Sequence, residues 1–298
     1  MAFSVFSHNT NDKVDKSLCP NGLNNPPFTF TIVGKRNSGK TNLIKSLTFE
    51  KYNNYFKQVL LMSGTQTTIN EFKEIHKQLN PDFEMILKHN YDEEYLRKMI
   101  EERENKISKG ERLEPMLVIL DDLATYNVSK KQTTNSIDTL FYNGRHVKID
   151  GVIITTQKYT QLNQSTRGNN ITSLFLHRMM PKDLKQVYDE VANQIIDSYQ
   201  EFKRIYRENV VDIPYGFIIL DLVENVVLNN ELKEIEVSDE DSSEEEVLKP
   251  QSMIQTETPK VRRVVMEENQ YYLELTNNTK IPISENKLKV LCEKLIST

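Results

Sequence analysis

The sequence predicts an α/β domain, with a mostly parallel central sheet flanked by helices, followed by a small C-terminal appendage. Two observations predict it. From Pro27 to about residue 230, short apolar runs alternate with amphipathic helical patterns, as they do in βα units. Most of the apolar runs are continuous rather than alternating, which is typical of strands covered on both faces. At 298 residues, the chain is long enough to bury one core of this size.

Six apolar runs are the predicted strands. Each is short, and most are rich in branched aliphatic residues, which favours a strand over a helix. The predicted strands are Phe28–Val33, Val59–Ser63, Met116–Leu120, Gly151–Thr155, Ser173–Leu176 and Gly216–Leu220.

Two helices can be predicted from their patterns. One runs from Asp92 to Lys109, where acids at the start and lysines at the end suit the helix dipole and Gly110 provides a stop. A longer helix is predicted from Leu184 to Tyr206, because apolar residues recur there at steps of three and four. Such a stripe predicts one face packed on the core.

The ends of the chain are predicted to lie outside the α/β domain, which spans 27–232. Residues 1–26 are polar and form an irregular arm. The acidic, serine-containing segment 233–257 has the composition of a disordered linker. Residues 258–298 are predicted to form a small module. Its predicted elements are the strands Val264–Met266 and Tyr271–Leu275 and a short helix, Leu288–Ile296.

The net charge of −5 arises from one segment, residues 234–246, which holds eight acids and no base. Removing these acids changes the formal charge of the chain to +3. The rest of the chain is therefore mildly basic, which is compatible with a nucleic-acid partner.

The composition indicates the class of protein. A hydrophobic content of 38% and a charged content of 27% are typical of soluble globular proteins. Because no apolar run approaches the roughly 20 residues of a membrane-spanning helix, we expect no membrane insertion. We also expect no secretory signal. Cys19 and Cys292 lack the spacing of a metal site or disulfide framework, which favours a reducing, intracellular compartment.

One octet, GKRNSGKT, matches the phosphate-binding pattern G-x-x-x-x-G-K-[ST], and its context supports the match. An apolar strand runs directly into it and a helical pattern runs directly out. The alternative is an ordinary glycine-containing turn, which these flanks disfavour. The candidate nucleotide-binding residues are Gly34, Lys35, Arg36, Asn37, Ser38, Gly39, Lys40 and Thr41.

The chemistry of this octet is that of a site for a nucleoside triphosphate. Gly34 and Gly39 let successive backbone N–H groups point at phosphate oxygens, and the following helix dipole adds to the attraction. Lys40 reaches the β- and γ-phosphates, and the Thr41 hydroxyl ligates Mg²⁺. The predicted cofactors are therefore ATP and Mg²⁺, and the predicted fold is that of a P-loop nucleotide hydrolase.

Two acids follow the strand Met116–Leu120, at the edge of the sheet where the phosphate loop lies. Asp121 is predicted to act on Mg²⁺ through water, and Asp122 to orient and deprotonate the attacking water. Adjacent carboxylates repel unless a cation or a shared proton relieves them, which favours a metal site. An N-cap of a following helix is an alternative role for Asp122.

A third strand also ends in a polar group, Gln157, after Gly151–Thr155. A glutamine at this edge can sense the γ-phosphate and position water. By itself the signal is weak, since polar residues often close strands.

Four motifs, GKRNSGKT, LVILDDL, NGRHVKIDGVIITTQ and STRGNN, occur in this order within residues 27–230. Together they resemble the genome-packaging ATPases of large DNA viruses and virophages, the poxvirus-type members of the FtsK–HerA superfamily. The resemblance implies a homo-oligomeric ring, a pentamer or hexamer, that threads double-stranded DNA into a capsid. It also implies capsid or portal partners and a location in the host-cell cytoplasm or virus factory, with carriage in the virion as a further option.

The resemblance implies the places of further residues. The strand that ends in Gln157 is expected between the phosphate-loop strand and the acid strand. An arginine is expected to reach the nucleotide of a neighbouring subunit, with Arg167 as first candidate and Arg145 as second. Many superfamily members carry glutamate where this chain has Asp122, so the shorter carboxylate is a departure from the pattern.

Other functions use the same loop. A nucleoside or nucleotide kinase would need an acceptor pocket, whereas adjacent acids and a strand-end glutamine suit water activation better. A slowly hydrolysing, nucleotide-gated assembly scaffold would need the same site as a motor. A GTPase is disfavoured because no Asn-Lys-x-Asp motif follows a late strand.

Overall fold

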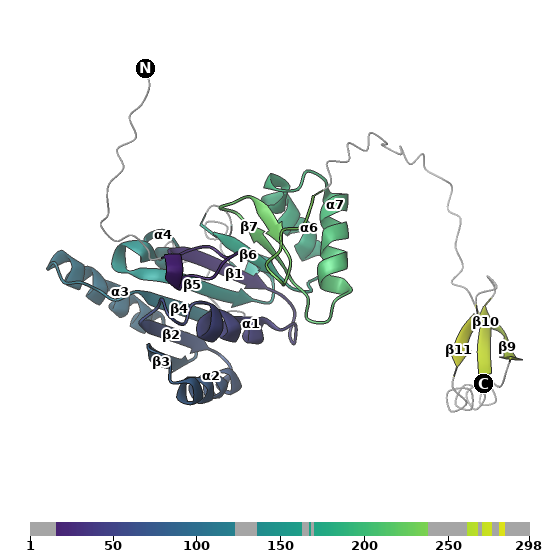
Figure 1. The fold of residues 1–298 in the computed structure, drawn as a ribbon, viewed down its shortest axis with the longest axis horizontal. Helices are drawn as coiled ribbons and strands as arrows, with labels where there is room; N and C mark the ends of the chain where they lie inside the picture. The colour runs from purple at the N-terminus through teal and green to yellow at the C-terminus, as the bar shows by residue number, and fades with distance from the viewer. Residues whose placement is uncertain are drawn as a thin grey trace, which may run out of the picture. The chain divides into compact units, whose positions relative to one another are not determined.

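The computed structural model describes residues 16–122, 136–162, 167 and 170–237, together with three C-terminal strands within 261–283. The chain divides into two compact units, Met1–Asp239 and Glu240–Thr298. The first unit is an eight-stranded sheet with helices on its faces, as Figure 1 shows.

The sheet has the order β3-β2-β4-β5-β1-β6-β7-β8. Its first six strands in this order pair in parallel, and β7 and β8 continue the sheet antiparallel. The predicted mostly parallel α/β sheet is confirmed. The strands are β1 (Phe28–Val33), β2 (Gln58–Ser63), β3 (Glu84–His89), β4 (Met116–Asp121), β5 (Ile149–Thr156), β6 (Ser173–Leu176), β7 (Ile218–Asp221) and β8 (Val226–Leu228).

All six predicted strands are present, with ends shifted by at most two residues. The strands β3 and β8 were not predicted. The strand β3 lies at the edge of the sheet, where its side chains are half-buried or exposed, so it lacks a continuous apolar run. The strand β8 has only three residues.

The helices are α1 (Lys40–Ser46), α2 (Gln66–Leu79), α3 (Glu93–Ser108), α4 (Ser136–Asn143), α6 (Pro181–Glu190) and α7 (Tyr199–Tyr206). The start of α3 is confirmed: the Asp92 side chain accepts a hydrogen bond from the Tyr95 amide at 2.9 Å. The helix α1 continues as a π-helical turn, Leu47–Lys51.

The single long helix predicted from Leu184 to Tyr206 is wrong. The chain forms α6, leaves the helical path at Val191, and starts α7 after Ser198. The Ser198 hydroxyl accepts from the Gln200 amide at 3.2 Å and thereby caps the new helix. The apolar periodicity predicted one helix because the apolar faces of α6 and α7 pack in the same core cluster, which contains both Leu184 and Phe202.

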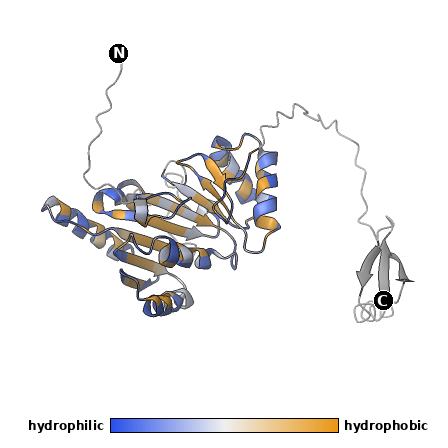
Figure 2. Ribbon diagram, viewed as in Figure 1, coloured by the Kyte–Doolittle hydropathy of each residue, from blue (hydrophilic) through white to orange (hydrophobic). Residues whose placement is uncertain are grey.

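The core consists of two clusters, one on each face of the sheet. Successive strand residues point to opposite faces, so Val118 of β4 joins one cluster and its neighbour Leu117 joins the other. Figure 2 shows the apolar strands of the sheet between helices with a polar outer face. Both faces are therefore covered, as the continuous apolar strands predicted.

The described ends of the first unit lie against the sheet. Asn24 is buried; its side chain donates to Asp221 at 2.9 Å and accepts from Ser173 at 2.5 Å. At the other end, the Ile235 amide donates to Val227 at 2.8 Å, and Val237 packs on the core. Residues 233–237, expected in the acidic linker, thus continue along the domain, and residues 238–257 lie outside the described part of the chain.

The described C-terminal strands form an antiparallel sheet in the order β11-β10-β9. They are β9 (Val261–Glu267), β10 (Gln270–Leu275) and β11 (Lys280–Ile283), so the predicted strand pair is present. The predicted helix Leu288–Ile296 lies outside the described residues. Among the described helices, none has both the length and the apolarity to span a membrane.

Candidate nucleotide and metal site

The octet forms a loop between β1 and α1 that is tied to both neighbouring strands. The Gly34 amide donates to the Thr156 carbonyl at the end of β5 (3.1 Å), and the Lys35 amide donates to the Arg178 carbonyl after β6 (2.9 Å). A Cβ at Gly34 would lie 2.5 Å from the Cβ of His177, and Gly39 has φ +100°. Glycine is therefore required at both positions.

The loop presents unpaired donors. Within the described part of the chain, the backbone N–H groups of residues 36–39 have no hydrogen-bond acceptor. They precede α1, whose dipole places partial positive charge at the same point. The arrangement is a cradle for an anion such as a polyphosphate.

Lys40 spans the cradle. Its buried amine donates to the Gly34 carbonyl at 2.7 Å and to the Lys35 carbonyl at 2.9 Å. Burial lowers the pKa of Lys40, and the carboxylates of Asp122 and Asp121 oppose that shift. The amine therefore faces both the loop and the two acids, where the β- and γ-phosphates of a bound triphosphate would lie.

Asp121 is the last residue of β4 and is buried. One carboxylate oxygen accepts from the Thr155 hydroxyl of β5 at 2.7 Å, and the other accepts from the Ser63 hydroxyl of β2 at 2.9 Å. Two neighbouring strands thus hold the carboxylate in place. Because both oxygens already accept from the protein, this residue suits contact with a cation through water.

Asp122 lies just beyond the strand with φ +54°, a conformation that is uncommon outside glycine. Its amide donates to the Thr155 hydroxyl at 2.8 Å, and its carboxylate accepts from the Gln157 side-chain amide at 3.1 Å. The residues 123–135, which would show whether Asp122 caps a helix, lie outside the described part.

Gln157 reaches Asp122 because β5 lies between β1 and β4. This is the strand order that the resemblance implied. The structure thus brings Lys40, Asp121, Asp122 and Gln157 together at the carboxyl edge of the sheet.

Thr41 is the second residue of α1 and is half-buried next to Lys40. The described residues contain no group of three or more histidines, cysteines or acids that could hold a metal by themselves. One hydroxyl and one strand-end carboxylate nevertheless fit Mg²⁺, which keeps several waters and takes its other ligands from substrate phosphates.

Ser63, Thr155 and His177 belong to this site but were not predicted. Each is a polar residue within one position of the end of a buried strand, a signal similar to the one that marked Gln157. For Ser63 and Thr155, only the pairing of β2 and β5 on either side of β4 shows that they meet Asp121.

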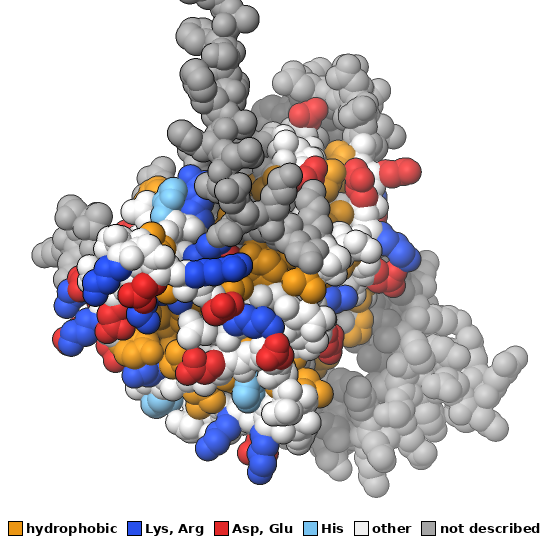
Figure 3. Space-filling view, turned by 60° about the vertical axis from the view of Figure 1, so that its left-hand side comes forward, with side chains coloured by type: hydrophobic (Ala, Val, Ile, Leu, Met, Phe, Trp, Pro, Cys, Tyr) orange, Lys and Arg blue, Asp and Glu red, His pale blue; other side chains and the backbone are white. Residues whose placement is uncertain are grey.

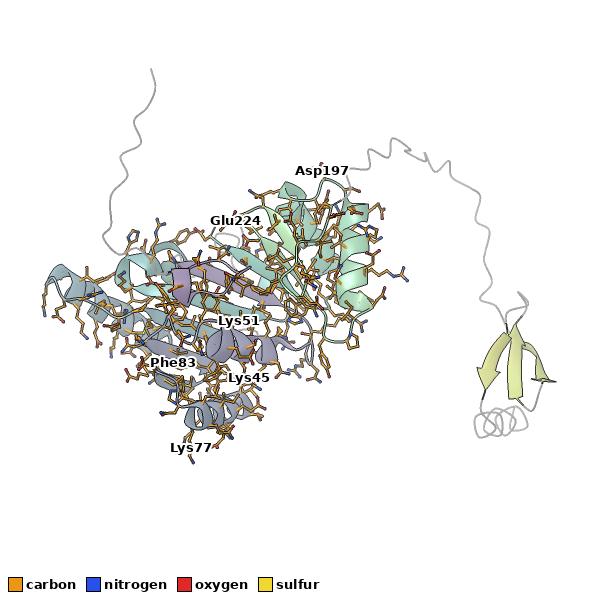
Figure 4. The ribbon with its side chains drawn as sticks, viewed as in Figure 1. Lys45, Lys51, Lys77, Phe83, Asp197 and Glu224 are labelled. Atoms are coloured by element: carbon orange, nitrogen blue, oxygen red, sulfur yellow. The ribbon has the colours of Figure 1, made fainter. Side chains whose placement is uncertain are left out.

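A cavity of about 440 Å³ adjoins the phosphate loop. The loop residues from Asn37 to Asn42 form one side, and Thr65, Thr68 and Glu71 of the β2–α2 region form the other. Lys45 of α1, labelled in Figure 4, lines this cavity and pairs with Glu71 at 2.5 Å. The cavity is large enough for a nucleotide's phosphates.

Arg167 does not lie at the surface, as an arginine for a neighbouring subunit would. Only 9% of it is exposed, and its guanidinium pairs with Glu190 at 3.3 Å and lies over the Tyr159 ring. It would have to leave Glu190 to act on another subunit. The residues on both sides, 163–166 and 168–169, lie outside the described part.

Arg145 is exposed, in a short turn after α4. It lines a cavity with Phe28 and Thr29, the first residues of β1, whereas the phosphate loop follows the last. A six-residue strand spans about 20 Å, so Arg145 lies at the opposite edge of the sheet. It cannot serve the nucleotide of its own subunit.

The sequence profile of the family described as Poxvirus A32 protein matches residues 16–205, more than half of the chain. The chain belongs to this family. Membership confirms the resemblance to poxvirus-type genome-packaging ATPases that the four motifs indicated. A comparison with curated protein sequences gives no significant match.

Solved structures with some similarity to this chain include viral and bacterial ATPases. The DNA-packaging ATPase B204 of Sulfolobus turreted icosahedral virus is similar over 72% of this chain and 100% of its own, with 16% identity and a TM-score of 0.49. For the B204 of Sulfolobus turreted icosahedral virus 2 in complex with ATPγS, the similar part covers 70% of this chain and 98% of that chain, with 15% identity and a TM-score of 0.48. For ATPases 2 and 3 of EssC from Geobacillus thermodenitrificans, the similar part covers 68% of this chain and 39% of that chain, with 14% identity and a TM-score of 0.49.

Proposed function

We propose that this chain is an ATP-hydrolysing motor that moves double-stranded viral DNA into a capsid. One observation carries the proposal: in a member of this family, the phosphate loop, two strand-end acids and a strand-end glutamine converge at one edge of the sheet. The reaction is the hydrolysis of ATP to ADP and phosphate.

Each residue has a distinct role in that reaction. The loop amides and Lys40 bind the phosphates and stabilise the charge that develops on the γ-phosphoryl group. Asp122 accepts the proton of the attacking water, and the Gln157 side chain, which donates to Asp122, keeps that carboxylate and the water in line. Thr41 and Asp121 are the residues that would hold Mg²⁺, the hydroxyl of Thr41 as a ligand and the carboxylate of Asp121 through water. When bound, the metal neutralises charge on the β- and γ-phosphates.

Assembly into a ring would complete the site. An arginine from a neighbouring subunit adds positive charge at the transferred phosphate, and such residues are worth about 10³–10⁵ in rate elsewhere. Arg145 is exposed and therefore a candidate for this role, and Arg167 could take it only after leaving Glu190.

The surface that grips DNA is not assigned to particular residues. On the face drawn in Figure 3, basic and acidic side chains are interspersed. A motor of this kind binds the DNA backbone through charge and independently of sequence, and we propose that contact with DNA and capsid proteins takes place in the infected cell.

ATP turnover measured with and without double-stranded DNA tests the function. We expect stimulation by DNA of any sequence, lost as salt rises from 50 to 200 mM. Phosphate transfer to a nucleoside in place of water would support the kinase instead. Unstimulated turnover together with stable ring assembly would support the scaffold.

Two substitutions test the assigned roles. Lys40→Ala should abolish turnover and weaken ATP binding, because the charge on the phosphates is lost. Asp122→Asn should keep ATP bound and stop turnover, because only the base is lost. Normal turnover by Asp122→Asn would show that this carboxylate is not the base.

A further inference from the structure

A second cavity, of about 430 Å³, lies beside the phosphate site on the other flank of α1. Its walls include Leu43 and Leu47 of α1, with Phe175 of β6 and Phe217 just before β7. The walls are therefore largely apolar and aromatic. Ligand cavities of about 300–1,000 Å³ accept small organic molecules.

The two cavities are adjacent. Gly39, Asn42 and Tyr215 line both of them. Gly39 and Asn42 flank Lys40 and Thr41. The second cavity therefore begins next to the place where the α-phosphate of a bound nucleotide, the one attached to the ribose, would lie. A molecule with phosphates in the loop and a flat, apolar portion could fill both.

Tyr215 stands at the junction. Its side chain is exposed, with 73% of the residue accessible. A Cβ at the next residue, Gly216, would lie 2.2 Å from the Asn209 carbonyl, so only glycine permits this close approach. Tyr215 itself has a left-handed φ of +57°, and it lines both cavities.

A buried polar group lies at the same junction. His177 is 1% exposed, lines the second cavity and packs against Phe217, with 5.1 Å between the ring centroids. Neither ring nitrogen makes a hydrogen bond of ordinary geometry among the described residues, although the ring faces the backbone of Ser38. Burial, and then the charge of Lys40, lowers the pKa of His177 to about 4, so the ring is neutral at pH 7 and offers one donor and one acceptor.

We infer that this cavity holds the nucleobase of the bound ATP, with the base stacked on the Tyr215 ring and its edge against Leu43 and Phe217. The inference rests on the proposed nucleotide site. Shared lining residues connect the base to the phosphates, and the neutral His177 ring lies in the wall of the cavity next to them. Stacking tolerates either purine but favours purines over pyrimidines, whose smaller ring covers less of the tyrosine.

Calorimetric titration of the full chain with ATP, CTP and inorganic triphosphate tests the pocket. Triphosphate fills the loop but has no base. In Tyr215→Ala, we expect ATP affinity to fall about tenfold, the preference for ATP over CTP to shrink, and triphosphate affinity to stay unchanged. Tyr215→Phe keeps the ring and should retain wild-type affinities. Tyr142→Ala, at an exposed tyrosine of α4 that lines another cavity, is the matched control.

The outcomes separate this inference from the proposed function. Unchanged ATP affinity in Tyr215→Ala would overturn the base pocket, as would an equal loss of ATP and triphosphate binding, which indicates a disturbed loop. A wild-type chain that binds triphosphate as tightly as ATP would overturn it too. Tight, Tyr215-dependent ATP binding without DNA-stimulated turnover would refute the motor and leave the pocket intact.

Discussion

Thr155 joins the two acids of the site, and replacing it with valine tests how they are held. The hydroxyl is fully buried; it donates to Asp121 at 2.7 Å and accepts from the Asp122 amide at 2.8 Å. Valine has nearly the same shape and no polar atom, so the change removes both hydrogen bonds and leaves the packing in place.

The magnitude follows from these two contacts. A hydrogen bond to a charged group contributes about 1.5–3 kcal/mol, and a buried amide without an acceptor costs about 1–3 kcal/mol. Asp121 keeps its bond to Ser63, so the carboxylate is only partly released. We therefore expect Thr155→Val to lower the free energy of unfolding by about 3 kcal/mol.

The same change should weaken the metal site. A residue that orients a metal-holding carboxylate typically affects metal affinity by about 10–100-fold. Thr155→Val should therefore raise the Mg²⁺ concentration needed for half-maximal ATP turnover by roughly this factor. Thr155→Ser keeps the hydroxyl and should restore the Mg²⁺ dependence while losing only a methyl group.

Urea unfolding followed by circular dichroism measures the stability, and a Mg²⁺ titration of ATP turnover measures the site. The reasoning is refuted if Thr155→Val matches the wild type in both. Lost stability with an unchanged Mg²⁺ requirement would show that Thr155 supports the fold without positioning Asp121 for the metal.

Three further predictions follow from the described contacts. Mixing inactive Arg145→Ala and Lys40→Ala subunits should restore part of the ATP turnover if Arg145 acts between subunits; no recovery in rings that demonstrably mix would exclude it. A chain ending at Asp239 should keep the full-length melting temperature of the ATPase domain, whereas one ending at Asn230 loses residues that pack on the sheet and should melt lower. Between pH 6.5 and about 4 the unfolded chain binds a proton at His177 that the folded chain does not, so the free energy of unfolding should fall as the pH falls through this window. The variant His177→Phe should flatten this pH dependence, measured by urea unfolding at several pH values. An unaltered pH dependence would count against the buried neutral ring.

Much of the site could be predicted without the fold. The residues from Gly34 to Thr41 are contiguous, because a loop that wraps phosphate must bring successive amides together, and the octet alone reveals them. Asp121, Asp122 and Gln157 were visible as polar residues that close apolar strands. In a parallel sheet such residues gather at one edge whatever the order of the strands.

The order of the strands decided the rest. Ser63 and Thr155 meet Asp121 only because β2 and β5 flank β4, and this pairing joins residues 58 and 34 positions away in the chain. The burial of Arg167 against Glu190 likewise depends on where α6 ends, and its predicted action on a neighbouring subunit stays a prediction. The predicted long helix failed for the same reason, since two helices can share one apolar period.

The sequence by itself therefore determined the fold class, the phosphate loop and the chemistry at the strand ends, because periodicity and short motifs are local properties of a chain. The tertiary structure alone decided which hydroxyls hold the acids, which arginine is exposed and where an aromatic ring faces a cavity beside the loop. Those features depend on contacts between residues far apart in the chain, and no local pattern records such contacts.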